Sequence, residues 1–301
     1  MSSWRHGTKL NYNTYLTRWI RFCDRKHIDY LKPTDIQVLT FFSHLSKMGY
    51  TYRQMCAMRS ALSALLSNHL MGQTWGQLPL IKRYMKGLFE LAPVLPKVYY
   101  VWDVREVLSY LRSCPSPHEQ SFKMLSQNLA FLLGLLSGGQ RCQTIHQIEI
   151  PDISIAGGLL CIPVMGKIKQ TRPGKHMGPL QFRPYREPNL CLISLLTHYL
   201  KVSATYRTTP KLFISYTKPH SAVGRETIAR WCKSVLGYAG IDVNLFSSHS
   251  SRAAATSKAK SVGVSLTKIL ECAGWSNAQT FAGHYDKVVC PSDTFQDLLL
   301  K

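Results

Sequence analysis

Six side chains in the sequence have the types needed to break a phosphodiester bond without a metal ion or a nucleotide. In chain order they are Arg141, Lys169, His249, Arg252, Trp275 and Tyr285. The reaction needs a nucleophile, cations for the charge that builds on the non-bridging phosphate oxygens, and an acid for the departing 5′ oxygen. Guanidinium groups suit the phosphate, and a tyrosine beside cations ionises more readily than a free phenol. Each residue alone is a weak signal, but their order along the chain indicates this chemistry.

The spacing of these residues places most of them at expected helix ends. His249 and Arg252 lie three residues apart, so at the start of a helix both side chains share one face. Arg141 follows a pair of glycines and is expected to open a helix. Trp275 follows the end of one helix, and Tyr285 follows a short helical stretch ten residues later. The helix ends are therefore expected to bring the nucleophile and its cations together.

The proton donor is expected in a basic loop over residues 166–178. This loop contains Lys167, Lys169 and Lys175. A lysine suits the transfer of a proton to the leaving oxygen. We favour Lys169 for this role and keep Lys167 as the alternative, because both belong to the same loop.

The charge of the chain indicates a polyanionic partner. Lys and Arg number 37 against 16 Asp and Glu, which gives a formal net charge of +21. Lysine and arginine displace condensed counterions from phosphates, so nucleic acid is the expected partner. A basic protein without a specific polyanion is the alternative. No run of about 18 apolar residues is present, so we expect no membrane span, and the N-terminus does not have the pattern of a secretory signal.

The nine cysteines do not indicate a metal site or a disulfide framework. Their number is odd, and none of them form a CxxC pair. Cys114 and His118 lie close together in sequence but have no second ligand pair at zinc spacing. We therefore expect reduced thiols, no metal and no cofactor.

The expected fold is mainly α with a small antiparallel β-sheet (α+β). Residues 8–91 have helical periodicity throughout, with one helix starting at Pro33-Thr34-Asp35 and the last spanning 78–91. Two prolines in residues 92–96 cannot continue a helix, so the domain boundary is expected there. Asp103 is expected to cap the first helix after that boundary.

The second part of the chain is expected to mix helices with a few strands. A long apolar helix is predicted over 119–136. The strands are predicted at 147–155, 159–164 and 179–184. Five further helices are predicted at 190–203, 224–239, 250–261, 265–273 and 277–285.

These motifs resemble the tyrosine recombinase (phage integrase) family, and most closely the recombinases of DIRS-like and related eukaryotic mobile elements. The resemblance rests on residues 139–144, 169–174, 249–254 and 273–285. Residues 59–63 and 85–87 resemble the helical core-binding domain of that family, so the likeness covers nearly the whole chain.

The resemblance implies a division into four parts. Residues 1–92 would form a helical SAM-like core-binding domain that binds DNA, and residues 93–98 would form a linker. Residues 99–290 would form the tyrosine recombinase catalytic domain. Residues 291–301 would form a C-terminal tail that either docks on a neighbouring subunit or frays.

The resemblance also implies a role for each of the six residues. Tyr285 would attack the scissile phosphate and form a 3′-phosphotyrosine. Arg141 and Arg252 would clamp the phosphate, and His249 would hydrogen-bond to it and manage a proton. Lys169 would protonate the leaving 5′ oxygen. Trp275 would stand where many relatives carry histidine and would donate through its indole N–H. No ATP, metal or cofactor is needed, because the phosphotyrosine keeps the energy of the broken bond.

The implied partners are double-stranded DNA and further copies of the chain, as a homo-tetramer on two duplexes. A nuclear location follows from the eukaryotic resemblance. The chain departs from many relatives at Thr144, where they carry an acidic residue. His284 is interpreted as a surface residue of its helix. Two alternatives remain open: a catalytically inactive DNA-binding relic of a mobile element, and a type IB topoisomerase.

Overall fold

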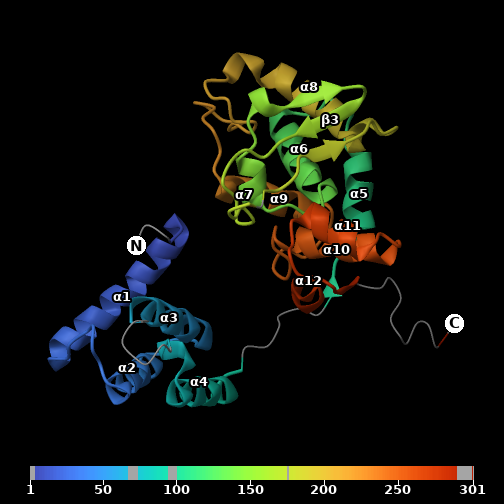
Figure 1. Ribbon diagram of the computed structural model, residues 1–301. Coiled ribbons are helices and arrows are strands. Elements are labelled where there is room, and N and C mark those ends of the chain that lie inside the picture. The colour runs from blue at the N-terminus through green and yellow to red at the C-terminus, as the bar shows by residue number, and fades with distance from the viewer. Residues whose placement is uncertain (1–3, 67–73, 94–99, 175, 290–299, 301) are drawn as a thin grey trace. The chain divides into compact units, whose positions relative to one another are not determined.

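The computed structural model describes residues 4–66, 74–93, 100–174, 176–289 and 300 of the chain. The chain divides into two compact units, Met1–Pro96 and Lys97–Lys301 (Figure 1). The division falls inside the segment predicted as a linker, of which only Pro93 is described. The predicted tail likewise lies outside the described residues, apart from Leu300.

The first unit is entirely helical in its described part. Its elements are α1 (His6–Lys26), α2 (Asp35–Lys47), α3 (Tyr52–Leu65), the 3-10 helix Trp75–Gln77 and α4 (Pro79–Leu91). The predicted helix start at Thr34 is confirmed as a capping box. The Gln37 amide donates to Thr34 Oγ1 (3.3 Å), and the Thr34 amide donates to Gln37 Oε1 (2.8 Å). Such reciprocal bonds satisfy donors that a helix start leaves unpaired.

The core of the first unit is formed by aromatic and methionine side chains from α1, α2 and α3. Five of them are at most 1% exposed: Trp19, Phe41, Phe42, Met55 and Met58. The Trp19 ring packs edge-on against Phe41 with 5.1 Å between their centroids. Burial of aromatic area is the main stabilising contribution here.

The second unit is built around one buried helix. Its helices are α5 (Val104–Ser113), α6 (Phe122–Leu136), α7 (Cys142–His146), α8 (Leu192–Ser203), α9 (Arg225–Tyr238), α10 (Ser250–Ser261), α11 (Leu266–Ala273) and α12 (Ala278–His284). Helix α6 packs against both α8 and α9, which explains why its sequence is apolar on nearly every side. The Asp103 carboxylate accepts a hydrogen bond from the Arg105 amide (2.9 Å), so the predicted cap of α5 is confirmed.

A three-stranded antiparallel sheet lies on the second unit in the order β2-β3-β4. The strands are β2 (Ser154–Ala156), β3 (Leu159–Ile162) and β4 (Leu180–Phe182). The second and third predicted strands are confirmed within these bounds. Of the first prediction, 147–155, only the last two residues lie in β2, and Glu149 forms an isolated antiparallel bridge with Lys211. Gln147 ends α7 and Ile150–Asp152 forms a 3-10 helix, because Pro151 fixes φ and lacks an N–H for strand pairing.

A short parallel pairing that the sequence did not indicate joins the two ends of the second unit. Strand β1 (Tyr100–Val101) pairs with β5 (Val288–Val289), which begins three residues after Tyr285. The next residue, Trp102, donates from its indole nitrogen to Ser250 Oγ at the start of α10 (2.9 Å). The first residues of the unit therefore support both α10 and the segment that carries Tyr285.

The described cysteines are all free thiols, and Cys290 lies outside the described residues. Among the helices that the structure describes, none is both long and apolar enough to cross a membrane.

Candidate active site

Five of the six predicted residues lie at helix ends in the second unit, and Lys169 lies in the loop between β3 and β4. Arg141 caps the N-terminus of α7, and His249 caps that of α10. Arg252 is in the first turn of α10, Trp275 follows the end of α11, and Tyr285 caps the C-terminus of α12. Figure 1 shows α10, α11 and α12 together at one end of the unit.

Arg252 connects three segments that are distant in sequence. Its side chain is 1% exposed, and Nη1 donates to Gly139 O (2.8 Å) while Nη2 donates to Ala273 O (2.5 Å). Gly139 has a φ of +69°, and a Cβ there would lie 2.7 Å from Arg252 Cα. Only glycine fits this conformation and this close approach. Helix α10 therefore lies directly against the turn that leads into Arg141.

Tyr285 lies among the predicted partners. Its hydroxyl is 3.2 Å from His249 Nε2, where the tautomer decides which atom donates. The Trp275 ring centroid is 4.5 Å from that of Tyr285. The Arg252 guanidinium lies 4.4 Å from the Trp275 centroid and 5.5 Å from the Tyr285 centroid. Ser257 Oγ donates to the Tyr285 carbonyl (2.7 Å), which fixes the backbone beside the hydroxyl.

Burial and neighbouring cations lower the pKa values of Arg252 and His249. Burial lowers the pKa of Arg252 to about 10, and the charge of Arg141 adds to this while Tyr285 opposes it. His249 is exposed as a residue, yet burial of its ring among protein atoms lowers the pKa of the imidazole. Three cations lower that pKa further: Arg141, Arg252 and Lys169. At neutral pH we therefore expect a charged Arg252 beside a neutral His249, which can accept a proton.

Three buried donors of the site have no hydrogen-bond partner among the described residues. They are Arg141 Nη1, Arg252 Nε and Trp275 Nε1. Buried donors are almost always paired in folded proteins, and two of these belong to cationic groups. An anion with several acceptor oxygens would satisfy them together, and a phosphodiester has that chemistry.

The choice of Lys169 over Lys167 as the lysine of the site stays a prediction. Both side chains are exposed, and the charge of Lys169 is among those that lower the pKa of His249. Lys175 lies outside the described residues. All six predicted residues thus lie in one neighbourhood, with Lys169 at its edge.

Several supporting residues were not predicted from the sequence. Gln140 Nε2 donates to the Cys272 carbonyl (2.6 Å), which holds the glycine turn to the end of α11. Thr144 Oγ1 donates to Gln140 Oε1 (3.4 Å), so this departure from the family pattern supports the turn. Ser257 and Gln170 were also missed. Gln140 could have been considered because it is next to Arg141 in sequence. No local sequence signal identifies Ser257.

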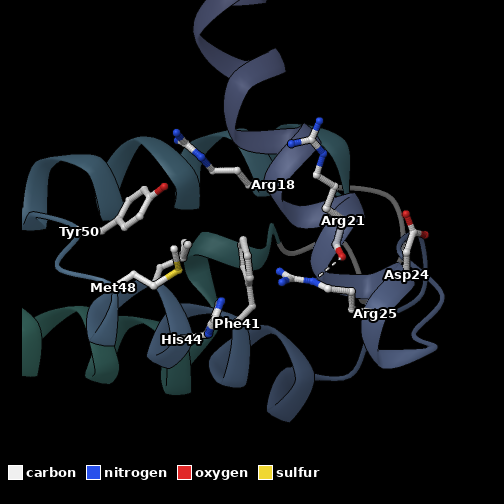
Figure 2. Close-up of a pocket in the computed structure, with 9 residues that line it drawn as sticks. Arg18, Arg21, Asp24, Arg25, Phe41, His44, Met48 and Tyr50 are labelled. Atoms are coloured by element: carbon white, nitrogen blue, oxygen red, sulfur yellow. Dashed lines mark hydrogen bonds between the residues drawn. The ribbon is translucent and has the colours of Figure 1, made fainter.

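A second basic site lies in the first unit. A hollow of about 520 Å³ is lined by Arg18, Arg21, Arg25, His44 and Tyr50 among others, and we call it the arginine hollow (Figure 2). The three arginines come from α1 and are exposed. The Arg18 guanidinium lies 5.2 Å from the Tyr50 ring centroid, and Arg25 Nε donates to the Arg21 carbonyl (3.2 Å). Asp24 is the one acidic residue in its lining, so the hollow is suited to anions.

At the level of sequence, no family model and no curated protein matches the chain. Solved structures do match it over nearly its whole length. The XerH site-specific recombinase bound to a palindromic difH substrate has a TM-score of 0.61 at 15% identity, covering 92% of this chain and 76% of that chain. The Tn1549 transposon integrase in complex with transposon right end DNA has a TM-score of 0.60 at 12% identity, covering 99% and 93%.

A third match is a lambda integrase dimer bound to a COC′ core site. Its TM-score is 0.53 at 12% identity, covering 97% of this chain and 93% of that chain. These proteins are tyrosine recombinases and integrases, and this chain, which is mostly helical with a small sheet, is consistent with their fold. The predicted fold class is confirmed: the chain has the tyrosine recombinase fold.

Proposed function

We propose that this protein breaks and rejoins double-stranded DNA through a covalent bond between Tyr285 and a 3′ phosphate. One observation carries the proposal: the Tyr285 hydroxyl lies 3.2 Å from His249 Nε2, beside the buried guanidinium of Arg252. A phenol next to a neutral base and a buried cation has the surroundings of an activated nucleophile. The solved structures of similar fold, which are recombinases and integrases, support the same class of reaction.

In the proposed first step, the Tyr285 oxygen attacks the phosphorus and the bond between phosphorus and the 5′ oxygen breaks. The phenolic proton passes to His249 Nε2, and Lys169 supplies a proton to the departing 5′ oxygen. Arg141, Arg252 and Trp275 donate to the non-bridging oxygens as negative charge builds there. Attack by a 5′ hydroxyl on the phosphotyrosine reverses these steps and joins two strands.

We further propose that four copies act together on two duplexes during strand exchange. Exchange between two duplexes breaks four strands, and each chain offers one Tyr285. The net charge of +21 supports extensive contact with the DNA backbone. The resemblance to recombinases of DIRS-like elements supports a role in moving or integrating a mobile element, and with it a nuclear location.

Covalent trapping tests the proposal. Labelled duplexes with a randomised central region and a nick beside it let the short 5′ fragment diffuse away after cleavage, so any adduct accumulates. We expect an SDS-resistant adduct whose digestion yields a peptide with a phosphotyrosine at residue 285. DNA binding without an adduct would identify a non-catalytic binding protein. Relaxation of a supercoiled plasmid without exchange between DNA molecules would identify a topoisomerase.

The rate of adduct formation is expected to fall at acidic pH. A protonated imidazole cannot accept the Tyr285 proton, so the rate should decline once His249 becomes charged. Because the pKa of His249 is lowered, this decline should begin below the pKa of an ordinary histidine, which is about 6.5. His249→Gln should slow the reaction about 10²- to 10⁴-fold and remove the acidic decline. An unchanged decline in that variant would assign it to another group.

The arginine hollow is expected to contact the DNA backbone. Alanine at both Arg21 and Arg25 should weaken binding to duplexes of any sequence and reduce the slope of log affinity against log salt by about 1 to 2. The exposed side chains should leave the unfolding midpoint unchanged. Lys9→Ala, on the same helix outside the hollow, should have a smaller effect. Salt titrations of fluorescent duplexes measure the slopes, and an unchanged slope in the double variant would count against this contact.

A further inference from the structure

The basic loop that contains Lys169 makes a tight turn over Ile168–Thr171. The Ile168 amide donates to Thr171 Oγ1 (3.1 Å), and the Thr171 amide donates to the Ile168 carbonyl (3.1 Å). Ile168 is only 1% exposed and anchors the turn in the protein. The two residues between them differ: Lys169 is exposed, whereas Gln170 is partly buried. The turn therefore presents one side chain to solvent and directs the other into the unit.

Gln170 packs against the backbone that precedes Trp275. A Cβ added at Gly274 would lie 3.2 Å from Gln170 Cγ and 3.3 Å from Nε2. Gly274 has a φ of +67°, which favours glycine in any case. The absence of a side chain at Gly274 thus leaves space for the carboxamide of Gln170 against the backbone next to Trp275.

Both polar atoms of the Gln170 carboxamide are buried and have no hydrogen-bond partner among the described residues. Leaving a buried amide unpaired is costly, so an unpaired carboxamide in this position calls for a partner that the protein itself does not supply. The other buried donors without partners in the second unit are Arg141 Nη1, Arg252 Nε and Trp275 Nε1. The carboxamide thus shares its unpaired, buried state with three donors of the candidate site, and it packs against the residue that precedes one of them, Trp275.

We propose that Gln170 is a further catalytic residue that donates from Nε2 to a non-bridging oxygen of the scissile phosphate. This inference rests on the proposed function, because it assumes a phosphodiester at Tyr285. Only the amide nitrogen can serve, since Oε1 and the phosphate oxygens are all acceptors.

The substitution Gln170→Leu removes the donor and keeps a side chain of similar size. The substrate is a nicked duplex whose sequence is recovered from the adducts that the wild-type protein forms in the trapping experiment. On it, we expect single-turnover adduct formation to slow about 100-fold, which is the effect of losing one preorganised donor to a developing oxyanion. Gln170→Glu should be slower still, because a carboxylate would face the phosphate. Gln181→Leu, at an exposed position of β4, should match the wild type. If the leucine variant unfolds early, Gln170→Met provides the same test.

A substrate with sulfur in place of the bridging 5′ oxygen distinguishes two roles for Gln170. In one, Gln170 contacts the phosphate directly; in the other, it only positions Lys169. A thiolate leaves without a proton donor, so the sulfur restores the rate when only the acid is misplaced. We expect it to restore Lys169→Met but not Gln170→Leu. Restoration of Gln170→Leu, or a wild-type rate for it on the ordinary duplex, would overturn this inference alone. No adduct with the wild-type protein would overturn the proposed function and this inference with it.

Discussion

Tyr285→Phe is expected to abolish the covalent protein–DNA adduct, with a loss of at least about 10⁴-fold in rate, because it removes the attacking oxygen. The aromatic ring remains, so its packing against Trp275 and the Ser257 bond to the Tyr285 carbonyl should persist. Folding and DNA affinity should therefore be close to those of the wild type. Gel analysis of the trapped complex measures the adduct, and a fluorescence titration measures the affinity.

Tyr238→Phe provides the matched control. Tyr238 is 54% exposed at the end of α9, in the same unit, and its ring lies near Tyr110. We expect this variant to form the adduct at the wild-type rate. Adduct formation that persists in Tyr285→Phe would show that a different residue is the nucleophile.

Alanine substitutions of the two arginines are expected to reduce activity alike but to affect the stability of the protein differently. Arg252→Ala and Arg141→Ala should each slow cleavage at least about 10³-fold, since each removes a cation from the charge that builds on the phosphate. Arg252 also satisfies the carbonyls of Gly139 and Ala273 inside the protein. Its loss leaves both unpaired, at a cost of about 1–3 kcal/mol each in the free energy of unfolding. No described side-chain hydrogen bond holds Arg141, and its Nη1 is unpaired.

Urea unfolding of the two variants measures this difference. A lower midpoint is expected for Arg252→Ala, whereas Arg141→Ala should stay near the wild type. DNA affinity at moderate salt should fall little in either, because a chain with a net charge of +21 has many other phosphate contacts available. Equal midpoints for the two variants would show that the internal bonds of Arg252 contribute nothing to folding. Equal losses of binding and cleavage would show that both residues act only through general electrostatic attraction to DNA and not in the cleavage step.

Local signals in the sequence were enough to predict most helix ends. The caps at Thr34 and Asp103 appear where a side-chain oxygen precedes an apolar helical pattern, and the structure confirms both. The spacing of His249 and Arg252 predicted that both lie at the start of α10, and the helical stretch before Tyr285 predicted its position at the end of α12. The resemblance then indicated which of these helix ends would meet.

Features that depend on contacts between distant segments were not predictable. Most of the strand expected over 147–155 is absent, because the residues before Ser154 form the end of α7 and a 3-10 helix that contains Pro151. The pairing of β1 with β5 involves two residues on each side, too few for a recognisable pattern. The burial of Gln170 depends on the missing side chain of Gly274, which lies more than a hundred residues along the chain.

The residues Tyr100–Trp102 have a practical consequence for any shortened form of this protein. They pair with β5, which follows the nucleophile, and they hydrogen-bond to Ser250 beside His249. A fragment that starts at α5 would retain all six site residues but lack the β1–β5 pairing and the Trp102–Ser250 hydrogen bond, which support the segments around Tyr285 and His249. If such a fragment were inactive, the loss of these contacts would explain it, and the six residues would not be called into question. Fragment boundaries for crystallisation or NMR should therefore be drawn ahead of Tyr100.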